Sequence, residues 1–304
     1  MLNLIPIKNS YMRFCNNFPL YYFSESGEPV LYKKAGENLK EGSFENNQYS
    51  DLFIRKEDEG AVAKQLQAAL NIEFARAISS KGIVAIKSSL CLIVEEALSG
   101  PLETNLTSLP ETIEILFYGT KKNPDLLDAL VVINNKSAKV IEHSVNVLAL
   151  VAQYCFFKKY SEERLKIFSL SALLHDIGLC RIEKEIIEKK ERLTDKEFSI
   201  YKKHAIKGFN VLQFYPTFDK SVSITALEHH ERLDGSGYPN GVKQISFESQ
   251  VVGLIDSYES LKYQEKTFRQ SLKPYDALQI IKKDVVLGKY NKKIFVDLCS
   301  CLIK

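Results

Sequence analysis

The sequence predicts a mainly α-helical protein that carries a small β-rich segment at its N-terminal end. Short apolar runs separated by turn residues stop near residue 57, and apolar residues recur at helical spacing from Glu59 onward. The chain has 304 residues, and 45% of them are hydrophobic, which is ample for a packed interior and argues against a disordered chain. A chain of this length is expected to form about two domains.

The first 57 residues contain four candidate strands, at Leu4–Ile7, Leu20–Phe23, Val30–Lys33 and Leu52–Arg55. The segment 24–29 looks like a hairpin loop, because Gly27 tolerates a positive φ and Pro29 lacks the N–H that a strand ladder needs. We therefore expect a β-rich unit over residues 1–57, followed by a helical unit over residues 59–122.

A second helical unit begins after residues 121–124, where Asn123 is a plausible helix cap and Pro124 a plausible first helical residue. We place the domain boundary near residue 122. Residues 1–122 would then form an N-terminal α+β module, and residues 123–304 a helical C-terminal domain. No phosphoacceptor or cofactor motif is visible in the N-terminal module, so the sequence assigns no particular input signal to it.

The composition excludes several classes of protein. The chain has 41 Lys and Arg residues against 38 Asp and Glu residues, a net charge of +3, which does not indicate a dedicated nucleic-acid binder. The best candidate for a membrane span, residues 82–98, is interrupted by Lys87, Glu95 and Glu96, so no span is expected. The six cysteines form no CxxC pair, as is typical of reduced thiols. Because the start of the chain also lacks the apolar core of a signal peptide, we expect a cytoplasmic protein.

The five histidines all fall between positions 143 and 230: His143, His175, His204, His229 and His230. His143 lies on a helical stripe with Val140, Val147, Val151 and Tyr154, so its ring should point into the bundle. His175 ends an apolar helix over 165–174, His204 is expected in mid-helix, and His229 and His230 close a helical run from residue 222. A single histidine on an apolar face is usually a core group with one hydrogen bond. Several in one bundle would each need a partner, because an unsatisfied buried polar group costs about 1–3 kcal/mol. A shared metal centre would satisfy them all. Imidazole with carboxylate suits Fe, Mn or Zn, and two adjacent histidines favour a roomy two-metal site over a tetrahedral Zn site.

Two motifs, LLHDIG at 173–178 and HHERLDGSGYPNG at 229–241, resemble the HD-GYP subgroup of HD-domain metal-dependent phosphohydrolases. The similarity extends to His143 and Ser144, to 193–204 and to 252–261, and it covers roughly residues 125–295. It implies a mainly α protein with a C-terminal HD-type helical bundle and a smaller N-terminal α+β module for regulation or interaction. The chain resembles a divergent member of the subgroup.

Members of this family hydrolyse cyclic di-GMP to pGpG or GMP with a dinuclear metal centre, usually of iron and sometimes of manganese, and a bridging hydroxide. Position by position, the resemblance implies that one metal is held by His143, His175, Asp176 and Asp256, and the second by His204, His229 and His230, with Asp176 bridging both. Asp176 would be the most consequential ligand, because its loss removes a ligand from both metals.

The resemblance also implies substrate-facing and loop residues, namely Arg269, Lys273, Gly237, Tyr238 and Pro239. In the family the loop that contains Tyr238 is associated with signalling partners, including diguanylate cyclases. A role for Tyr238 and Pro239 in merely shaping a loop beside the site is an equally good interpretation. Gly235 and Gly237 are expected to adopt backbone conformations closed to other residues.

Several positions depart from the family pattern: Leu179 replaces a phosphate-binding lysine, Lys139 a glutamate that recruits a third metal, Glu259 an aspartate, Phe268 a tyrosine and Leu233 a tryptophan. Arg181 is the nearby cation that could compensate at the phosphate. Two functions therefore stay open. The chain is either an active cyclic di-GMP phosphodiesterase, or a weak or inactive HD-GYP protein that binds metals and a phosphate ligand and acts as a receptor or scaffold. A general nucleotide phosphohydrolase is less favoured, because the HHE and GYP elements are specific to the subgroup.

Overall fold

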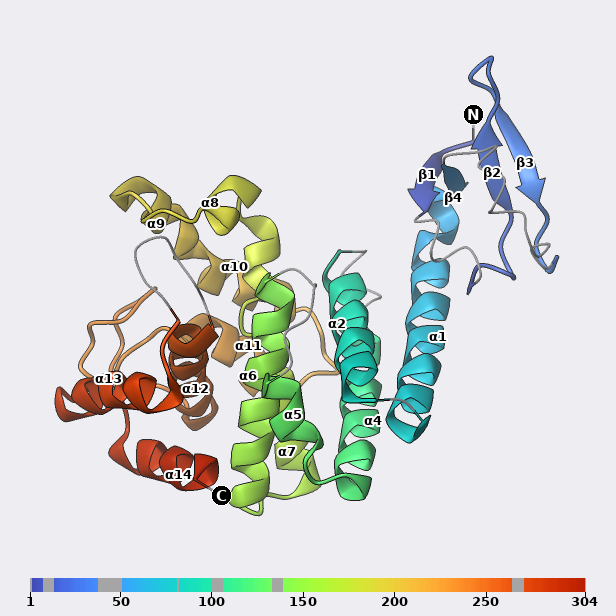
Figure 1. The fold of residues 1–304 in the computed structure, drawn as a ribbon. Coiled ribbons are helices and arrows are strands. Elements are labelled where there is room, and N and C mark those ends of the chain that lie inside the picture. The colour runs from blue at the N-terminus through green and yellow to red at the C-terminus, as the bar shows by residue number, and fades with distance from the viewer. Residues whose placement is uncertain are drawn as a thin grey trace.

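A small antiparallel sheet lies at one end of the long helix α1, away from the main helical body (Figure 1). The computed structural model describes residues 2–7, 14–37, 51–80, 82–99, 106–132, 139–263 and 271–303. The mainly α class with a small N-terminal sheet is confirmed.

The sheet consists of β1 (Leu4–Ile7), β2 (Leu20–Phe23), β3 (Pro29–Lys33) and β4 (Leu52–Arg55) in the spatial order β1-β4-β2-β3. All neighbouring pairs are antiparallel. The four predicted strands are confirmed, but the predicted hairpin loop is one residue too long, because Pro29 pairs with Phe23. Proline is tolerated there since β3 is an edge strand and Pro29 is its first residue.

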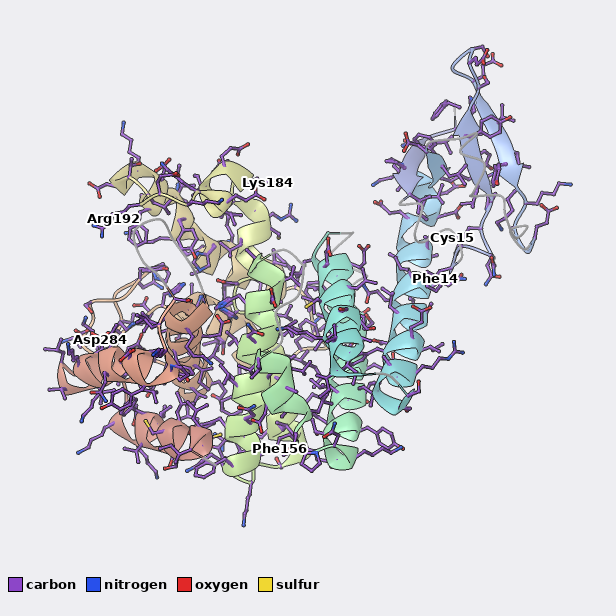
Figure 2. The ribbon with its side chains drawn as sticks, viewed as in Figure 1. Phe14, Cys15, Phe156, Lys184, Arg192 and Asp284 are labelled. Atoms are coloured by element: carbon purple, nitrogen blue, oxygen red, sulfur yellow. The ribbon has the colours of Figure 1, made fainter. Side chains whose placement is uncertain are left out.

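A small separate core joins the sheet to the start of α1 (Glu59–Ser80), and its buried members are Cys15, Leu20, Leu52, Ile54 and Val62. Figure 2 shows Phe14 and Cys15 where the sheet meets α1. There the side-chain amide of Gln65 donates to the carbonyl oxygen of Phe14, with an N–O distance of 2.6 Å. The sheet is therefore attached to the helical body through α1.

The helices that follow in the N-terminal part are α2 (Ile83–Ser99) and α4 (Leu109–Lys122), with short 3₁₀ turns at Lys56–Asp58 and Leu106–Ser108. One hydrophobic core runs from Phe74 of α1 through Leu90 of α2 into the C-terminal bundle at Leu148. The helices of 59–122 therefore pack directly on that bundle. The domain boundary near residue 122 stays a prediction.

The predicted helix start at Pro124 is wrong. Helix α4 is followed by Asn123, whose side-chain oxygen accepts the N–H of Asp125, and the next helix begins at Leu126. Pro124 therefore lies in the turn between two helices.

The C-terminal bundle contains α5 (Leu126–Val132), α6 (Lys139–Phe157), α7 (Glu162–Leu174), the 3₁₀ turn η4 (Ile177–Arg181), α8 (Lys184–Glu188), α9 (Asp195–Tyr201), α10 (Lys203–Leu212), α11 (Lys220–Glu228), α12 (Phe247–Tyr263), α13 (Pro274–Val286) and α14 (Lys292–Leu302). Helix α6 packs against α5, α7 and α12 and forms the centre of this arrangement.

One stretch of α6, Val140–Phe157, is long and apolar enough to cross a membrane by composition alone. Within the described residues, 83% of that stretch is buried by the rest of the protein, as expected for a core helix. The sequence-based candidate at 82–98 falls on α2, which has only 17 residues, and the stretch on α6 was not singled out. All six cysteines are free thiols, in agreement with the sequence interpretation.

Candidate metal centre

Helix α6 supplies the first histidine. The predicted apolar stripe through Val140, His143, Val147, Val151 and Tyr154 lies on this helix. His143 is only 2% exposed, and Val147, Val151 and Tyr154 are fully buried. The 3.6-residue period therefore correctly predicted that the His143 ring points into the bundle.

The end of α7 supplies His175 and Asp176. This apolar helix ends at Leu174, as predicted, and His175 is its C-cap. The Nδ1 of His175 lies 2.7 Å from the carbonyl oxygen of Ala172. Because a carbonyl oxygen only accepts, Nδ1 carries the proton and Nε2 keeps a free lone pair.

His204 and His229 are oriented by backbone carbonyls in the same way. The Nδ1 of His204 donates to the carbonyl oxygen of Tyr201 at 2.7 Å, and the Nδ1 of His229 donates to two carbonyl oxygens of α11 at 3.1 Å each. His229 is the C-cap of α11, as predicted. The prediction that His204 lies in mid-helix is wrong: α9 ends at Tyr201, and His204 is the second residue of α10.

The first group of ligand atoms comes from His143, His175 and Asp256. The Oδ1 of Asp256 lies 3.0 Å from Nε2 of His143 and 3.9 Å from Nε2 of His175. The Oδ2 of Asp176 faces the same group, 3.5 Å from Nε2 of His175 and 3.9 Å from Nε2 of His143.

The second group comes from Asp176, His204, His229 and His230, with one atom of each within 4.8 Å of the others. The Oδ1 of Asp176 lies 3.4 Å from Nε2 of His204 and 3.5 Å from Nε2 of His229. The two oxygens of Asp176 therefore face different groups. The structure brings all seven predicted ligands together.

The donor atoms fit a cation. The Nε2 atoms of His204 and His229 lie 3.4 Å apart, although both Nδ1 atoms already carry the ring protons. Neither Nε2 of His175 nor Oδ1 of Asp176 has a hydrogen-bond partner in the described part of the chain, and both are buried. Convergent buried lone pairs without a donor are costly unless a cation lies between them. Imidazole and carboxylate together suit a transition metal.

Burial and charge set the protonation states of these ligands. Burial acts to raise the pKa of Asp176, but the imidazoles of His175, His229 and His204 outweigh it and hold that pKa well below its ordinary range. Burial lowers the pKa of His204 to about 4. At neutral pH Asp176 is therefore a carboxylate and His204 is neutral, which are the states that metal binding requires.

Glu259 is a functional residue that the sequence reasoning noted only as a departure. One of its carboxylate oxygens accepts the Nδ1–H of His143, and Glu259 is 2% exposed. The signal was present in the sequence, because Glu259 follows Asp256 by three residues and so shares its face of α12. A carboxylate that orients a ligating histidine in this way is a common feature of metal sites.

The GYP loop, which contains Gly237, Tyr238 and Pro239, packs on the second group of ligand atoms. The ring of Tyr238 lies 4.6 Å from the ring of His230 and 6.3 Å from that of His204, measured between centroids. The carboxylate of Glu231 holds the loop by accepting the N–H groups of residues 240, 241 and 242. This favours a structural role for the loop beside the ligands, and Pro239 follows Tyr238 through a cis peptide bond.

A glycine is needed at position 237, but not for the backbone conformation that was expected. Gly235 has a φ of +85°, as expected, but Gly237 has no positive φ. A Cβ at Gly237 would instead lie 2.4 Å from the Cα of Glu231. Glycine is required there for space, because the loop passes directly over the end of the HHE motif.

The predicted phosphate-binding residues are only partly described. Leu179 is 5% exposed, so its side chain belongs to the core and not to an open surface. Arg181 ends η4 and is exposed, and Lys273 is the exposed N-cap of α13. Arg269 and Phe268 lie outside the described residues, as does the side chain of Lys139.

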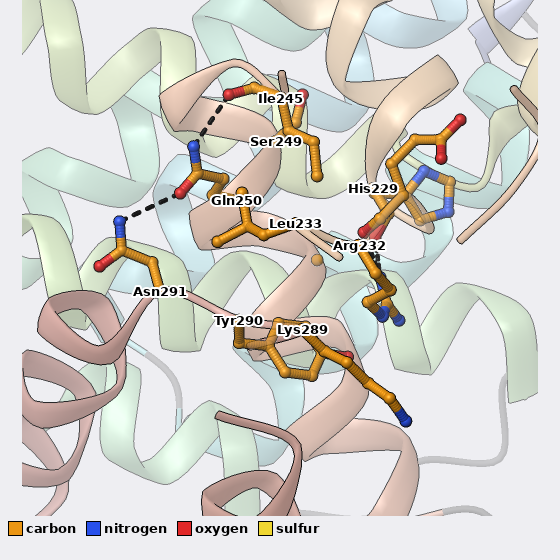
Figure 3. Close-up of a pocket in the computed structure, with 11 residues that line it drawn as sticks. His229, Arg232, Leu233, Ile245, Ser249, Gln250, Lys289, Tyr290 and Asn291 are labelled. Carbon is orange, nitrogen blue, oxygen red and sulfur yellow. Dashed lines mark hydrogen bonds between the residues drawn. The ribbon is translucent and has the colours of Figure 1, made fainter. Parts of the chain in front are cut away.

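A small cavity of about 10 Å³ lies beside His229 (Figure 3). Leu233, Arg232 and Tyr290 are among its lining residues, and the guanidinium of Arg232 lies 4.7 Å from the centroid of the Tyr290 ring. A cavity of this size holds about one water molecule and cannot admit a nucleotide. Leu233, which the resemblance places at the position of a tryptophan, therefore borders a space too small for a nucleotide.

The chain is similar to known proteins over its C-terminal part. Residues 130–294 match the HD domain family. The chain is 30% identical over 167 residues to the 3'3'-cGAMP-specific phosphodiesterase 1 of Vibrio cholerae, which covers 54% of this chain and 38% of that protein. It is 34% identical over 125 residues to the cyclic di-GMP phosphodiesterase PdeB of Borreliella burgdorferi, covering 40% of this chain and 32% of that protein. The chain thus spans well under half the length of these two curated relatives.

Two comparisons extend further along the chain. A cyclic di-GMP phosphodiesterase of Thermotoga maritima is 29% identical over 245 residues, which cover 78% of this chain and 65% of that protein. The solved structure of Bd1817, an HDG"Y"P protein from Bdellovibrio bacteriovorus, has a TM-score of 0.65 at 21% identity and covers 99% of this chain and 100% of that one. The fold similarity therefore includes the N-terminal sheet and helices.

Proposed function

This chain belongs to the HD-domain family, as an HD-GYP-type member, and we propose that it is a metal-dependent phosphodiesterase that hydrolyses cyclic di-GMP. The observation that carries this proposal is the position of Asp176, whose two carboxylate oxygens face two separate groups of ligand atoms. Relatives whose names specify cyclic di-GMP or 3'3'-cGAMP as substrate support the reaction class.

Two divalent cations would be held by His143, His175, Asp256 and Asp176 on one side and by His204, His229, His230 and Asp176 on the other. When bound, such a pair would supply an activated water at neutral pH and offset charge on the phosphodiester. We propose iron first and manganese second, as the family resemblance implies, and the imidazole and carboxylate donors suit both metals.

The chain's own residues would bind the substrate and orient the metal ligands. Nδ1–H groups that donate to backbone carbonyls fix the rings of His175, His204 and His229. Arg269, Lys273 and Arg181 are proposed to bind substrate phosphates, because their positive charge matches phosphate. We propose pGpG or GMP as the product and a cytoplasmic location, where such a messenger is made and consumed.

A second candidate function has an observation in its favour. Leu179 is buried where the family has a cation, so this chain lacks one phosphate contact. The protein would then bind metals and the dinucleotide but turn over slowly or not at all, and act as a receptor. Its GYP loop would be the contact for a signalling protein such as a diguanylate cyclase.

The experiment that separates the two functions uses the full chain, purified without oxygen and loaded with Fe(II) or Mn(II). Cyclic di-GMP and 3'3'-cGAMP are each supplied, the products are separated by chromatography, and bound metal is counted on the same sample. Metal-dependent pGpG or GMP, absent in Asp176→Asn, supports the enzyme. Two bound metals with dinucleotide binding but no product supports the receptor, and no bound metal contradicts both.

A further inference from the structure

Lys87 on α2 is fully buried, with 0% of its surface exposed. Its helix lies outside the residues that match the HD domain family. The ammonium group of Lys87 donates to Oδ1 of Asn146 on α6 at 2.9 Å and lies 3.1 Å from a carboxylate oxygen of Glu142. A buried ammonium needs such partners, because desolvation of a charge is expensive.

The contacts continue from Asn146 to the metal centre. The Nδ2 of Asn146 donates to one carboxylate oxygen of Glu259 at 2.7 Å, and the other oxygen of Glu259 accepts the Nδ1–H of His143. The Nε2 of His143 then lies 3.0 Å from Oδ1 of Asp256. A continuous network of buried hydrogen bonds therefore joins Lys87, on one of the N-terminal helices, to His143, a predicted ligand of the first group.

The donor and acceptor roles in this hydrogen-bond network are fixed. An ammonium group can only donate, so the amide oxygen of Asn146 must accept from Lys87 and its NH₂ must face Glu259. The carboxylate of Glu259 then accepts from Asn146 and from His143. A neutral His143, the state that metal binding requires, must carry its proton on Nδ1, and the lone pair of Nε2 is then directed at the metal position.

The buried charges in this network also require Lys87. Glu142 and Glu259 are 3% and 2% exposed, and they lie on the ligand-bearing helices α6 and α12. Within the described contacts, the Lys87 ammonium is a full positive charge placed against Glu142 and, through Asn146, linked to Glu259. Without it, Oδ1 of Asn146 and the carboxylate of Glu142 both lose a buried donor, and the Asn146 side chain is held only by its hydrogen bond to Glu259.

We propose that Lys87 is a positioning residue for the metal centre: through Asn146 and Glu259 it holds His143 in the orientation that binds the metal of the first group. The proposal rests on the metal centre described under Proposed function. It makes part of the centre's metal affinity a property of α2, a helix outside the HD domain match.

The test is Mn²⁺ titration of the metal-free 304-residue protein, followed by calorimetry, with Lys87→Met as the variant. Methionine keeps the length and packing of the side chain and removes the donor and the charge. We expect Mn²⁺ to bind about 10-fold more weakly at one of two sites, at the lower end of the effect of residues that orient metal ligands. The other site should keep its affinity.

A matched control is Thr112→Val. Thr112 is also fully buried between N-terminal helices, and its hydroxyl donates to the side-chain oxygen of Asn71 at 2.7 Å. It is not part of the hydrogen-bond network that starts at Lys87. The control should lower the melting temperature of the metal-free protein and leave both Mn²⁺ affinities unchanged. An equal loss of affinity in Thr112→Val would overturn the proposal, because it would show a general effect of loosened packing.

A second variant keeps the test decisive if Lys87→Met does not fold. Asn146→Ala leaves the Lys87–Glu142 pair in place and breaks the link to Glu259, so it should weaken the same single site. When both single variants fold, the double variant should lose no more affinity than either alone. Wild-type affinity in a folded Lys87→Met or Asn146→Ala protein refutes the proposal, whereas absence of Mn²⁺ binding in the unaltered protein refutes the metal centre itself.

Discussion

Replacing Asp176 with asparagine is the most informative single change, because one oxygen of Asp176 faces each ligand group. Asparagine keeps the shape of the side chain and removes the negative charge. Its amide NH₂ can donate to an unprotonated Nε2, so the metal-free variant is expected to fold. Metal binding should weaken at both positions.

The size of the effect follows from the number of ligands. Structural zinc sites with four protein ligands bind their metal with about 10–16 kcal/mol, or about 2.5–4 kcal/mol per ligand, which sets the scale for one lost ligand. Because about 1.4 kcal/mol corresponds to a tenfold change, loss of one ligand should weaken each metal by about 10²- to 10³-fold. The comparison variant His143→Gln removes a ligand from the first group alone and should weaken one metal.

The assay is Mn²⁺ titration calorimetry with metal counts on the purified proteins. Two weakened sites in Asp176→Asn and one in His143→Gln agree with a shared carboxylate. If Asp176→Asn keeps one site at its original affinity, the carboxylate serves a single metal, and the argument from its two oxygens fails.

Three further predictions concern the surroundings of the centre. In Gly178→Ala the new Cβ would lie 1.9 Å from the carbonyl oxygen of His204, so we expect a loss of about 3 kcal/mol or more in chemical denaturation, whereas Gly82→Ala meets no atom within 4 Å and should differ little. Burial lowers the pKa of His204 from about 6.5 to about 4, so the unfolded chain binds the proton first. This histidine alone should cost the metal-free protein up to about 1.4 kcal/mol of stability per pH unit as pH falls from 6.5 toward 4, and His175 and His230, whose pKa values burial also lowers, act in the same direction; a flat profile in this range contradicts the assignment. Tyr238→Phe should keep the ring contact with His230 and the melting temperature, whereas Tyr238→Ala should cost about 2 kcal/mol, and equal melting temperatures would show that the ring contact contributes nothing.

Local patterns predicted those features that depend on neighbouring residues alone. The four strands were found because each is a short apolar run between turn residues, and the burial of His143 followed from its 3.6-residue stripe. The seven ligands followed from a resemblance whose motifs are long and specific.

Features that depend on distant contacts were missed. The break between α9 and α10 falls in a run of helix-forming residues, and it places His204 where its carbonyl oxygen comes very close to Gly178. The link from Lys87 to Asn146 joins residues 59 positions apart, and no local pattern pairs them. In the sequence Lys87 only appeared to interrupt an apolar stretch.

The position of the ligands has a consequence for the lifetime of the protein. They come from five places along the chain, from His143 on α6 to Asp256 on α12, so each bound cation would cross-link helices that are distant in sequence. A cation bound by the folded chain alone, at 1,000 times its dissociation constant, adds about 4 kcal/mol to the free energy of unfolding. In a chain whose cysteines are all free thiols, these cations would act as reversible staples. When the metal is scarce, the helical bundle would then be exposed to proteolysis, and the protein would also be inactive.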